Sequence, residues 1–333
     1  MGVRMISMLF WLISCKGCSA LFFMPSLPTG GAVEDPPPFD TGIEDPTEIE
    51  DTGDQLPPPA ICTNMEEEPN DAVGDEQALP LEQWMCGYFG QVGDNDGFAF
   101  DIDRASWVRV RVRAEALGSL ANPRAFIYDE DGEFEASFED SYLTSDIDTT
   151  FLLDEPRELA IGILEQEIGS LQFGEEYQWR LMVSVVKAPV TWNQEEIEEN
   201  DSRADANPVA DGDRVFGRIE HGARYDWFEL EVDDERTDVV IQTDSWMHGS
   251  PLSPEILIEG PDGEEVDRAS EHDVPSNRDA KVSFTATEPG SYMIRVGSCC
   301  SGESARPGGL PNWYVLDVSA TPAPAEGDTG GDE

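Results

Sequence analysis

The chain of 333 residues repeats itself, because a set of residues recurs without a gap at a displacement of 130 positions. Six residues recur unchanged, and the pairs are Glu66/Glu196, Glu68/Glu198, Asn70/Asn200, Asp71/Asp201, Asp96/Asp226 and Phe98/Phe228. Phe100 and Ile102 return as Leu230 and Val232, so their apolar character is kept. Unrelated segments are not expected to agree in this way. We therefore predict two copies of one module, at residues 61–188 and 195–320, each long enough to bury its own core.

Short alternating segments fill both copies and predict β-strands rather than helices. In WVRVRVRA, residues 107–114, three valines alternate with Arg109, Arg111 and Arg113, as in a strand with one buried face. The three arginines could bind an anionic ligand. In so acidic a chain, however, we expect them to pair with carboxylates on neighbouring strands. Asp131-Gly132, between two apolar runs, predicts a hairpin turn. The fold class is therefore all-β.

Acidic side chains dominate the composition, with 70 Asp and Glu against 20 Lys and Arg and a formal net charge of −50. Such a charge repels phosphate backbones, so nucleic acid is excluded as a partner. Carboxylates that converge need cations, and hard divalent ions such as Ca²⁺ suit them. Most of these residues are expected simply to solvate the surface.

The N-terminus has the pattern of an export signal. Residues 1–14 carry Arg4 and then a short apolar run, which is typical of a signal peptide and too short for a membrane span. Leu12-Ile13-Ser14-Cys15 resembles a bacterial lipobox, so we predict lipidation at Cys15 and a membrane anchor through its acyl chains. An ordinary secretory signal is the alternative. The predicted location is the outer membrane or cell surface, or, in the alternative, outside the cell.

The anchor region leads into an acidic, proline-rich linker, and residues 15–60 together are predicted to be a disordered tether. Residues 31–60 hold nine acidic residues, seven prolines and no Lys or Arg, so they cannot bury apolar surface. Asp-Thr-Gly, the tripeptide of aspartic proteases, occurs at Asp40 and Asp51, and again at Asp328 in the acidic tail 321–333. None is flanked by the apolar strands that a shared-proton carboxylate pair requires, so we interpret all three as spacer.

Six cysteines fit an oxidising compartment. A disulfide between Cys62 and Cys86 would close a loop of about 24 residues and contribute about 3 kcal/mol. The pairing of Cys18, Cys299 and Cys300 is left open.

The pattern E-x-E-P-N-D, followed about 28 residues later by G-D-x-D-x-F-x-F, resembles the bacterial pre-peptidase C-terminal domain. Its residues in the first copy are Glu66, Glu68, Pro69, Asn70, Asp71, Gly93, Asp94, Asp96 and Phe98. The resemblance implies two tandem jelly-roll-like antiparallel β-sandwich domains, of a kind that accompanies secreted peptidases and that in some relatives holds Ca²⁺. The second copy departs from the pattern with Glu199 in place of the proline and with Ala223 and Arg224 before Asp226.

A calcium site is predicted from the same residues. In an extended segment, positions i, i+2 and i+4 face the same side, so Glu66, Glu68 and Asn70 present oxygen atoms together, and Asp96 can add a carboxylate. The candidate ligands in the two copies are Glu66, Glu68, Asn70, Asp71 and Asp96, and Glu196, Glu198, Asn200, Asp201 and Asp226. The alternative is that Asn70 and Asp71 cap a turn while the glutamates face water.

Catalytic motifs are not found. All three histidines, His221, His248 and His272, belong to the second copy, so two homologous modules do not share histidine chemistry. We therefore predict a non-catalytic surface or periplasmic lipoprotein that acts as a binding or structural module for an extracellular protein or polysaccharide. The alternative is an accessory or targeting component of a secreted peptidase or other extracellular enzyme.

Overall fold

The computed structural model describes residue 62 and residues 64–71, 74–138, 145–166, 173–220, 225–234, 236–270, 279–298 and 309–323. The signal segment, Cys15, the tether and all three Asp-Thr-Gly tripeptides lie outside these residues, as do Cys18, Cys299, Cys300, His221 and His272. Among the residues described, no helix is long and apolar enough to span a membrane.

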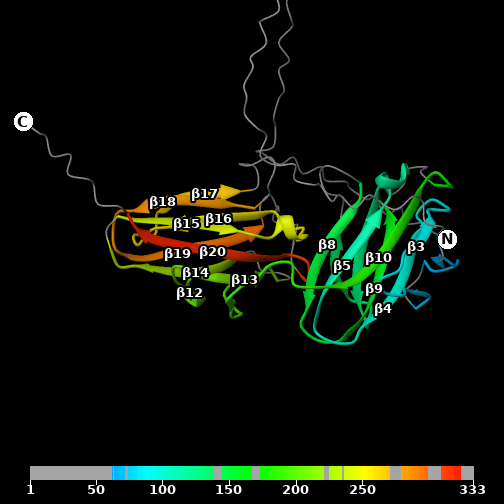
Figure 1. The fold of residues 1–333 in the computed structure, drawn as a ribbon, viewed down its shortest axis with the longest axis horizontal. Helices are drawn as coiled ribbons and strands as arrows, with labels where there is room; N and C mark the ends of the chain where they lie inside the picture. Colours follow the sequence, from blue (N-terminus) through cyan, green and yellow to red (C-terminus); the bar gives the residue numbers. More distant parts are fainter. Residues whose placement is uncertain are drawn as a thin grey trace, which may run out of the picture. The chain divides into compact units, whose positions relative to one another are not determined.

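The first module consists of two five-stranded sheets, in the orders β1-β3-β10-β5-β8 and β2-β4-β9-β6-β7. Their strands are β1 (Asn64–Met65), β2 (Gln77–Ala78), β3 (Met85–Tyr88), β4 (Asn95–Ile102), β5 (Ser106–Arg113), β6 (Pro123–Asp129), β7 (Phe134–Phe138), β8 (Ile147–Leu153), β9 (Arg157–Glu165) and β10 (Gln178–Val186). A 3-10 helix, η1 (Glu115–Leu117), follows β5. In Figure 1, β3, β10, β5 and β8 lie side by side in one layer and β4 and β9 in another.

The second module repeats this plan strand for strand, in sheets ordered β11-β13-β20-β15-β18 and β12-β14-β19-β16-β17. Its strands are β11 (Gln194–Glu195), β12 (Asn207–Val209), β13 (Arg214–Arg218), β14 (Tyr225–Val232), β15 (Thr237–Thr243), β16 (Pro254–Glu259), β17 (Glu265–Ser270), β18 (Lys281–Ala286), β19 (Gly290–Ser298) and β20 (Trp313–Pro322). Short 3-10 helices η2 (Arg203–Asp205) and η3 (Trp246–His248) complete it. The predicted all-β class with two β-sandwiches is confirmed.

The strand predicted from WVRVRVRA is β5, and its valines Val108, Val110 and Val112 are fully buried. Arg109 and Arg113 both pair with Asp148 of β8, at 2.7 and 2.9 Å. Pairing with a carboxylate on the neighbouring strand is therefore confirmed for these two arginines. The guanidinium of Arg111 lies over the ring of Trp84, 5.4 Å from its centroid.

The predicted hairpin joins β6 to β7. Gly132 adopts a φ of 77°, a left-handed conformation that side chains disfavour, and its N–H donates to the carbonyl of Asp129.

Cys62 and Cys86 form a disulfide with a Cα–Cα distance of 6.2 Å, which joins the segment before β1 to β3.

The two modules share buried contacts and belong to one compact unit. Trp107 of β5 and Trp313 of β20 meet edge to face at 4.9 Å, and the ring of Phe216 contacts both. Trp313 is fully buried, and its Nε1–H donates to the carbonyl of Thr150 in β8 at 2.5 Å. The backbone N–H of Thr150 in turn donates to the carbonyl of Gly249. The second module thus packs on the outer face and edge of one sheet of the first.

Candidate metal centres

Each sandwich holds a cluster of carboxyl and amide groups where the segment after its first strand crosses the next strands. In the first sandwich Glu66 Oε1 accepts the backbone N–H of Tyr88 at 2.9 Å, and Glu68 Oε2 accepts that of Asn70 at 3.2 Å. Gly87 makes room for the cluster, because a Cβ there would lie 2.1 Å from Glu66 Oε2. The segment is thereby fixed with its acidic side chains toward β3 and β4.

Asp96 lies at the bottom of this first cluster. It is fully buried in β4, and its Oδ2 accepts the indole N–H of Trp179 from β10 at 2.9 Å. Burial, followed by the neighbouring charge of Glu66, raises the pKa of Asp96 to about 9. Burial likewise raises the pKa of Glu66 to about 7. Without a cation, this site therefore retains protons at neutral pH.

The second sandwich repeats the arrangement with tyrosine in place of tryptophan. Tyr314 Oη lies 2.6 Å from Asp226 Oδ2 and 3.0 Å from Glu196 Oε2. One hydroxyl proton cannot serve both carboxylates, so a second proton or a cation is needed between them. Burial raises the pKa of Glu196 to about 8, and burial, then the charge of Glu196, raises the pKa of Asp226 well above its usual value.

The oxygens that come closest together differ between the copies. In the first sandwich they belong to Glu68, Asp71 and Asp94, whose carboxylate atoms lie within 4.8 Å of one another. In the second they belong to Glu196, Glu198 and Asp226. The predicted residues gather only in part. In the first sandwich Glu68 and Asp71 belong to the set and Asp94 joins them, whereas Glu66 and Asp96 do not belong to it. In the second sandwich Asp201 is exposed and lies outside the set. Asp94 was recognised in the family motif but not as a ligand.

Buried oxygens without hydrogen-bond partners favour a metal site over a turn cap at some of these residues. Asp71 does accept a backbone N–H, but from Asn95 at the start of β4 rather than from its own turn, at 3.3 Å. Asn70, by contrast, is 1% exposed, and its side chain has no hydrogen-bond partner among the described residues. The same holds for one oxygen on each of four further buried side chains, namely Asp94, Asp96, Asn200 and Asp226. Buried polar atoms without partners are costly, and carboxylate and amide oxygens are the ligands that Ca²⁺ prefers, so the residues fit this ion.

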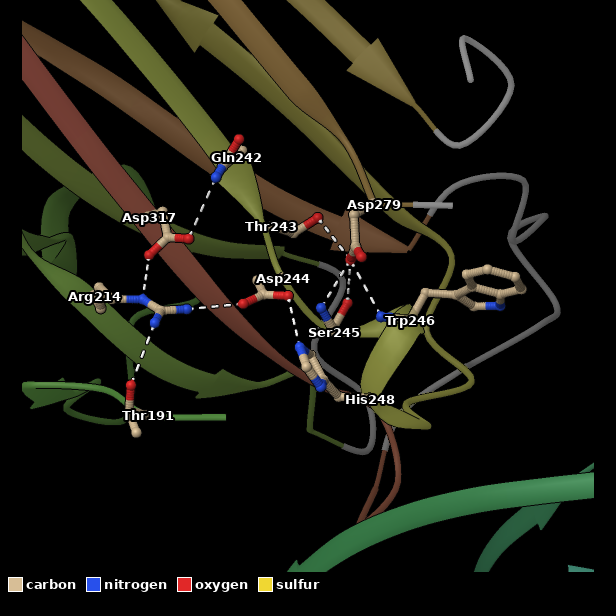
Figure 2. Close-up of polar contacts among 10 residues, drawn as sticks. All are labelled: Thr191, Arg214, Gln242, Thr243, Asp244, Ser245, Trp246, His248, Asp279 and Asp317. Carbon is tan, nitrogen blue, oxygen red and sulfur yellow. Dashed lines mark hydrogen bonds and ion pairs between the residues drawn. The ribbon is translucent and has the colours of Figure 1, made fainter. Parts of the chain in front are cut away.

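A separate polar network at the end of the second sandwich is structural (Figure 2). Asp279 accepts hydrogen bonds from Thr243, from the backbone and hydroxyl of Ser245, and from the N–H of Trp246, which fixes the turn from β15 into η3. Asp146 does the same in the first sandwich through the N–H of Ala114 at 2.7 Å. His248 pairs with Asp244 at 3.0 Å and lies outside both carboxylate clusters.

Comparison with protein-family models finds no match, and comparison with curated proteins finds none either. Among solved structures, the chain is similar to the pre-peptidase C-terminal domain of a collagenase from Bacillus anthracis, with 15% identity, 34% of this chain and 94% of that chain covered, and a TM-score of 0.27. It is also similar to the tandem CBM22 domains of Xyn10C from Paenibacillus barcinonensis, with 10% identity, coverage of 71% and 85%, and a TM-score of 0.22. The tandem CBM51 modules of Sp3GH98 from Streptococcus pneumoniae match with 8% identity, coverage of 71% and 83%, and a TM-score of 0.23. These likenesses are too weak to assign a family or a ligand.

Proposed function

We propose that this chain is a non-catalytic, exported binding module whose two β-sandwiches are each stabilised by a bound Ca²⁺ ion. The observation that carries the proposal is a pair of buried positions whose oxygens have no hydrogen-bond partner among the described residues in either copy, Asn70 with Asn200 and Asp96 with Asp226. A cluster that served only solvation would face water. Here Asn70, Asp96, Asn200 and Asp226 are all at most 1% exposed.

The two sites are proposed to use overlapping but different ligand sets. In the first sandwich Glu68, Asp71 and Asp94 supply carboxylates, and Asn70 adds an amide oxygen. In the second, Glu196, Glu198 and Asp226 supply carboxylates, and Asn200 adds the amide. A divalent cation at either place removes the repulsion among these carboxylates. It also satisfies the unpartnered oxygens of Asn70 and Asp94 in the first sandwich and of Asn200 and Asp226 in the second. Its chemical contribution is structural, because it joins the segment after the first strand to the sheet behind it.

Calcium is expected to raise the melting temperature of the full chain in a saturable way. An ion that binds only the folded state adds RT ln(1 + [L]/Kd), which is about 2.7 kcal/mol at a hundredfold excess over Kd. Asp94→Asn removes one carboxylate from the first site, and Asp226→Asn removes one from the second. Each substitution is therefore expected to abolish part of the rise in melting temperature. Differential scanning calorimetry with Ca²⁺ and with EDTA measures it.

The matched control is Asp101→Asn, which changes an exposed carboxylate on β4, the strand that carries Asp96. This variant should respond to Ca²⁺ as the wild-type chain does. If EDTA and millimolar Ca²⁺ give the same wild-type melting temperature, the clusters are protonated structural groups and the calcium proposal is wrong.

Export and anchoring are the remaining parts of the proposal, and they rest on the sequence alone. Leu12-Ile13-Ser14-Cys15 supports lipidation at Cys15, with the acidic linker as the tether between membrane and sandwiches. Replacing Cys15 by Ser is expected to move the protein from the membrane fraction to the soluble fraction on cell fractionation. Membrane association that is unchanged in the Cys15→Ser chain would argue for a different mode of attachment.

A further inference from the structure

The outer face of sheet β2-β4-β9-β6-β7 in the first sandwich carries aromatic rings. Phe126 and Tyr128 alternate along β6 with the buried Ala125 and Ile127, so their rings point away from the core. Phe134 of β7 is 48% exposed, and its ring centroid lies 6.5 Å from that of Phe126 and 6.2 Å from that of Tyr128. Single exposed apolar side chains are ordinary, but a contiguous group of three indicates a binding surface.

Small residues lie beside these rings. In the strand register, Phe126 stands opposite Gly162 of β9, and Tyr128 stands opposite Ala160. Ala160 is in turn opposite Ala99 of β4, and both alanines are partly exposed. Side chains on one face of a sheet stand about 4.5 to 5.5 Å from their cross-strand neighbours. The surface beside the rings is therefore low at Ala99 and Ala160, and a ligand can lie there against the sides of the rings. Above Gly162 the space is taken by Asn95 Oδ1 and the Tyr128 ring.

The equivalent face of the second sandwich is filled by its own side chains. Gly97 of β4 corresponds, at the displacement of 130, to Trp227 of β14. Arg295 stands opposite Trp227, and its guanidinium lies 4.0 Å from the ring centroid of Tyr225 and hydrogen bonds to Glu255. The fold therefore does not require a low aromatic face, which is a property of the first sandwich.

We propose that this aromatic face, formed by Phe126, Tyr128 and Phe134 beside Ala99 and Ala160, binds an uncharged glycan chain. The proposal rests on the binding function proposed above and names its ligand class. A sugar ring has an apolar C–H face, which packs on an aromatic ring, and a rim of hydroxyl groups. One polar group lies at these rings: the Arg124 guanidinium is over the Phe126 ring, 5.1 Å from its centroid, so the ligand is expected to contact Phe126 at its edge.

Charge and area favour a neutral glycan over other partners. The net charge of −50 disfavours acidic polysaccharides and anionic lipid surfaces. A stable protein interface buries roughly 1,200 to 2,000 Å² in total, whereas three partly buried aromatic side chains expose only a fraction of their roughly 150 to 250 Å² each. This area suits a narrow ligand that contacts a few rings.

The test is affinity electrophoresis of the full chain with Ca²⁺, in gels that contain xylan, mixed-linkage β-glucan, glucomannan or amylopectin, with polygalacturonate as the anionic comparison. At least one neutral polysaccharide should retard the wild-type chain. Phe126→Ala and Tyr128→Ala should each weaken that affinity at least tenfold. Ala160→Arg keeps the rings and fills the surface beside them, so it should also weaken the affinity at least tenfold. Trp227→Ala, on the equivalent face of the second sandwich, should have no effect.

Three outcomes would overturn the inference: no retardation by any neutral polysaccharide, retardation by polygalacturonate alone, or binding that persists in both Tyr128→Ala and Ala160→Arg. Melting curves with Ca²⁺ on the same preparations separate this failure from failure of the proposed function. A normal calcium response without glycan binding would reject the glycan inference but not the proposed calcium sites. Glycan binding that survives in every variant would reject the aromatic face as the binding site, and the binding function would then belong to another surface.

Discussion

The metal-free chain is expected to lose stability as the pH rises from about 5 to about 9. Burial raises the pKa of Glu66 to about 7, of Glu196 to about 8 and of Asp96 to about 9. The folded state therefore keeps protons that the unfolded chain has already released. This stabilisation is complete below the usual pKa of a carboxyl group. It is lost as the pH passes through the raised values.

Denaturant unfolding at pH 5, 7 and 9 in EDTA measures this loss, and the same series in millimolar Ca²⁺ tests its cause. Calcium binds the ionised clusters and offsets the repulsion among their carboxylates, so its stabilising effect should increase with pH. Asp96→Asn and Asp226→Asn remove an ionisable group from each cluster and should flatten the curve in EDTA, whereas Asp101→Asn should not. A metal-free chain whose stability rises from pH 5 to pH 9 would contradict the assignment of buried, protonated carboxyls.

Replacing Trp313 by Ala is expected to have the largest effect of any single change between the sandwiches. The fully buried ring contacts Trp107 and Phe216, and its N–H satisfies the carbonyl of Thr150. Removing a buried Trp or Phe side chain typically costs about 3 to 5 kcal/mol. In the wild-type chain we expect calorimetry to show one transition for both sandwiches. In Trp313→Ala we expect two transitions at lower temperatures, because the shared contact is lost.

Trp227→Ala is the matched control, since this ring lies on the outer face of the second sandwich and is only partly buried. It should lower the melting temperature slightly and leave the number of transitions unchanged. A single transition at the wild-type temperature in Trp313→Ala would show that the contacts between the sandwiches contribute little.

The strands were predictable because their side chains alternate. Val108, Val110 and Val112 needed only the period of two to be assigned to the core, and Gly132 needed only its place between two apolar runs. The partner of Arg111 was not predictable in this way. Trp84 lies just before β3, and the sequence does not reveal that this segment comes next to β5 through β10.

Of the residues in the candidate metal centres, the sequence predicts only those that recur in both copies. Identity at a displacement of 130 selects Glu66 with Glu196 and Asp96 with Asp226, but it cannot select Trp179 and Tyr314. These two donors differ in type and lie on the last strand of each sandwich, so their role appears only when that strand pairs with β3 or β13.

One residue in the sequence indicates the contact between the sandwiches, because the alternation pattern of its strand places it on the outer face. Trp107 falls on the same face of β5 as Arg109, Arg111 and Arg113, which is the face turned away from the core. A large aromatic ring at such a position calls for a partner outside its own sandwich. The partners, Phe216 and Trp313, lie more than a hundred residues away in the chain, and only the folded structure brings them together.

The second sandwich also covers a sheet edge, with a consequence for what a fragment of this protein would do. Strand β8 ends its sheet, and Thr150 has its backbone N–H bonded to Gly249 and its carbonyl bonded to Trp313. A first sandwich released by proteolysis would expose these groups on an edge next to the bare ring of Trp107. Exposed edges of this kind recruit strands from other chains. The intact tandem therefore protects its own first half from self-association.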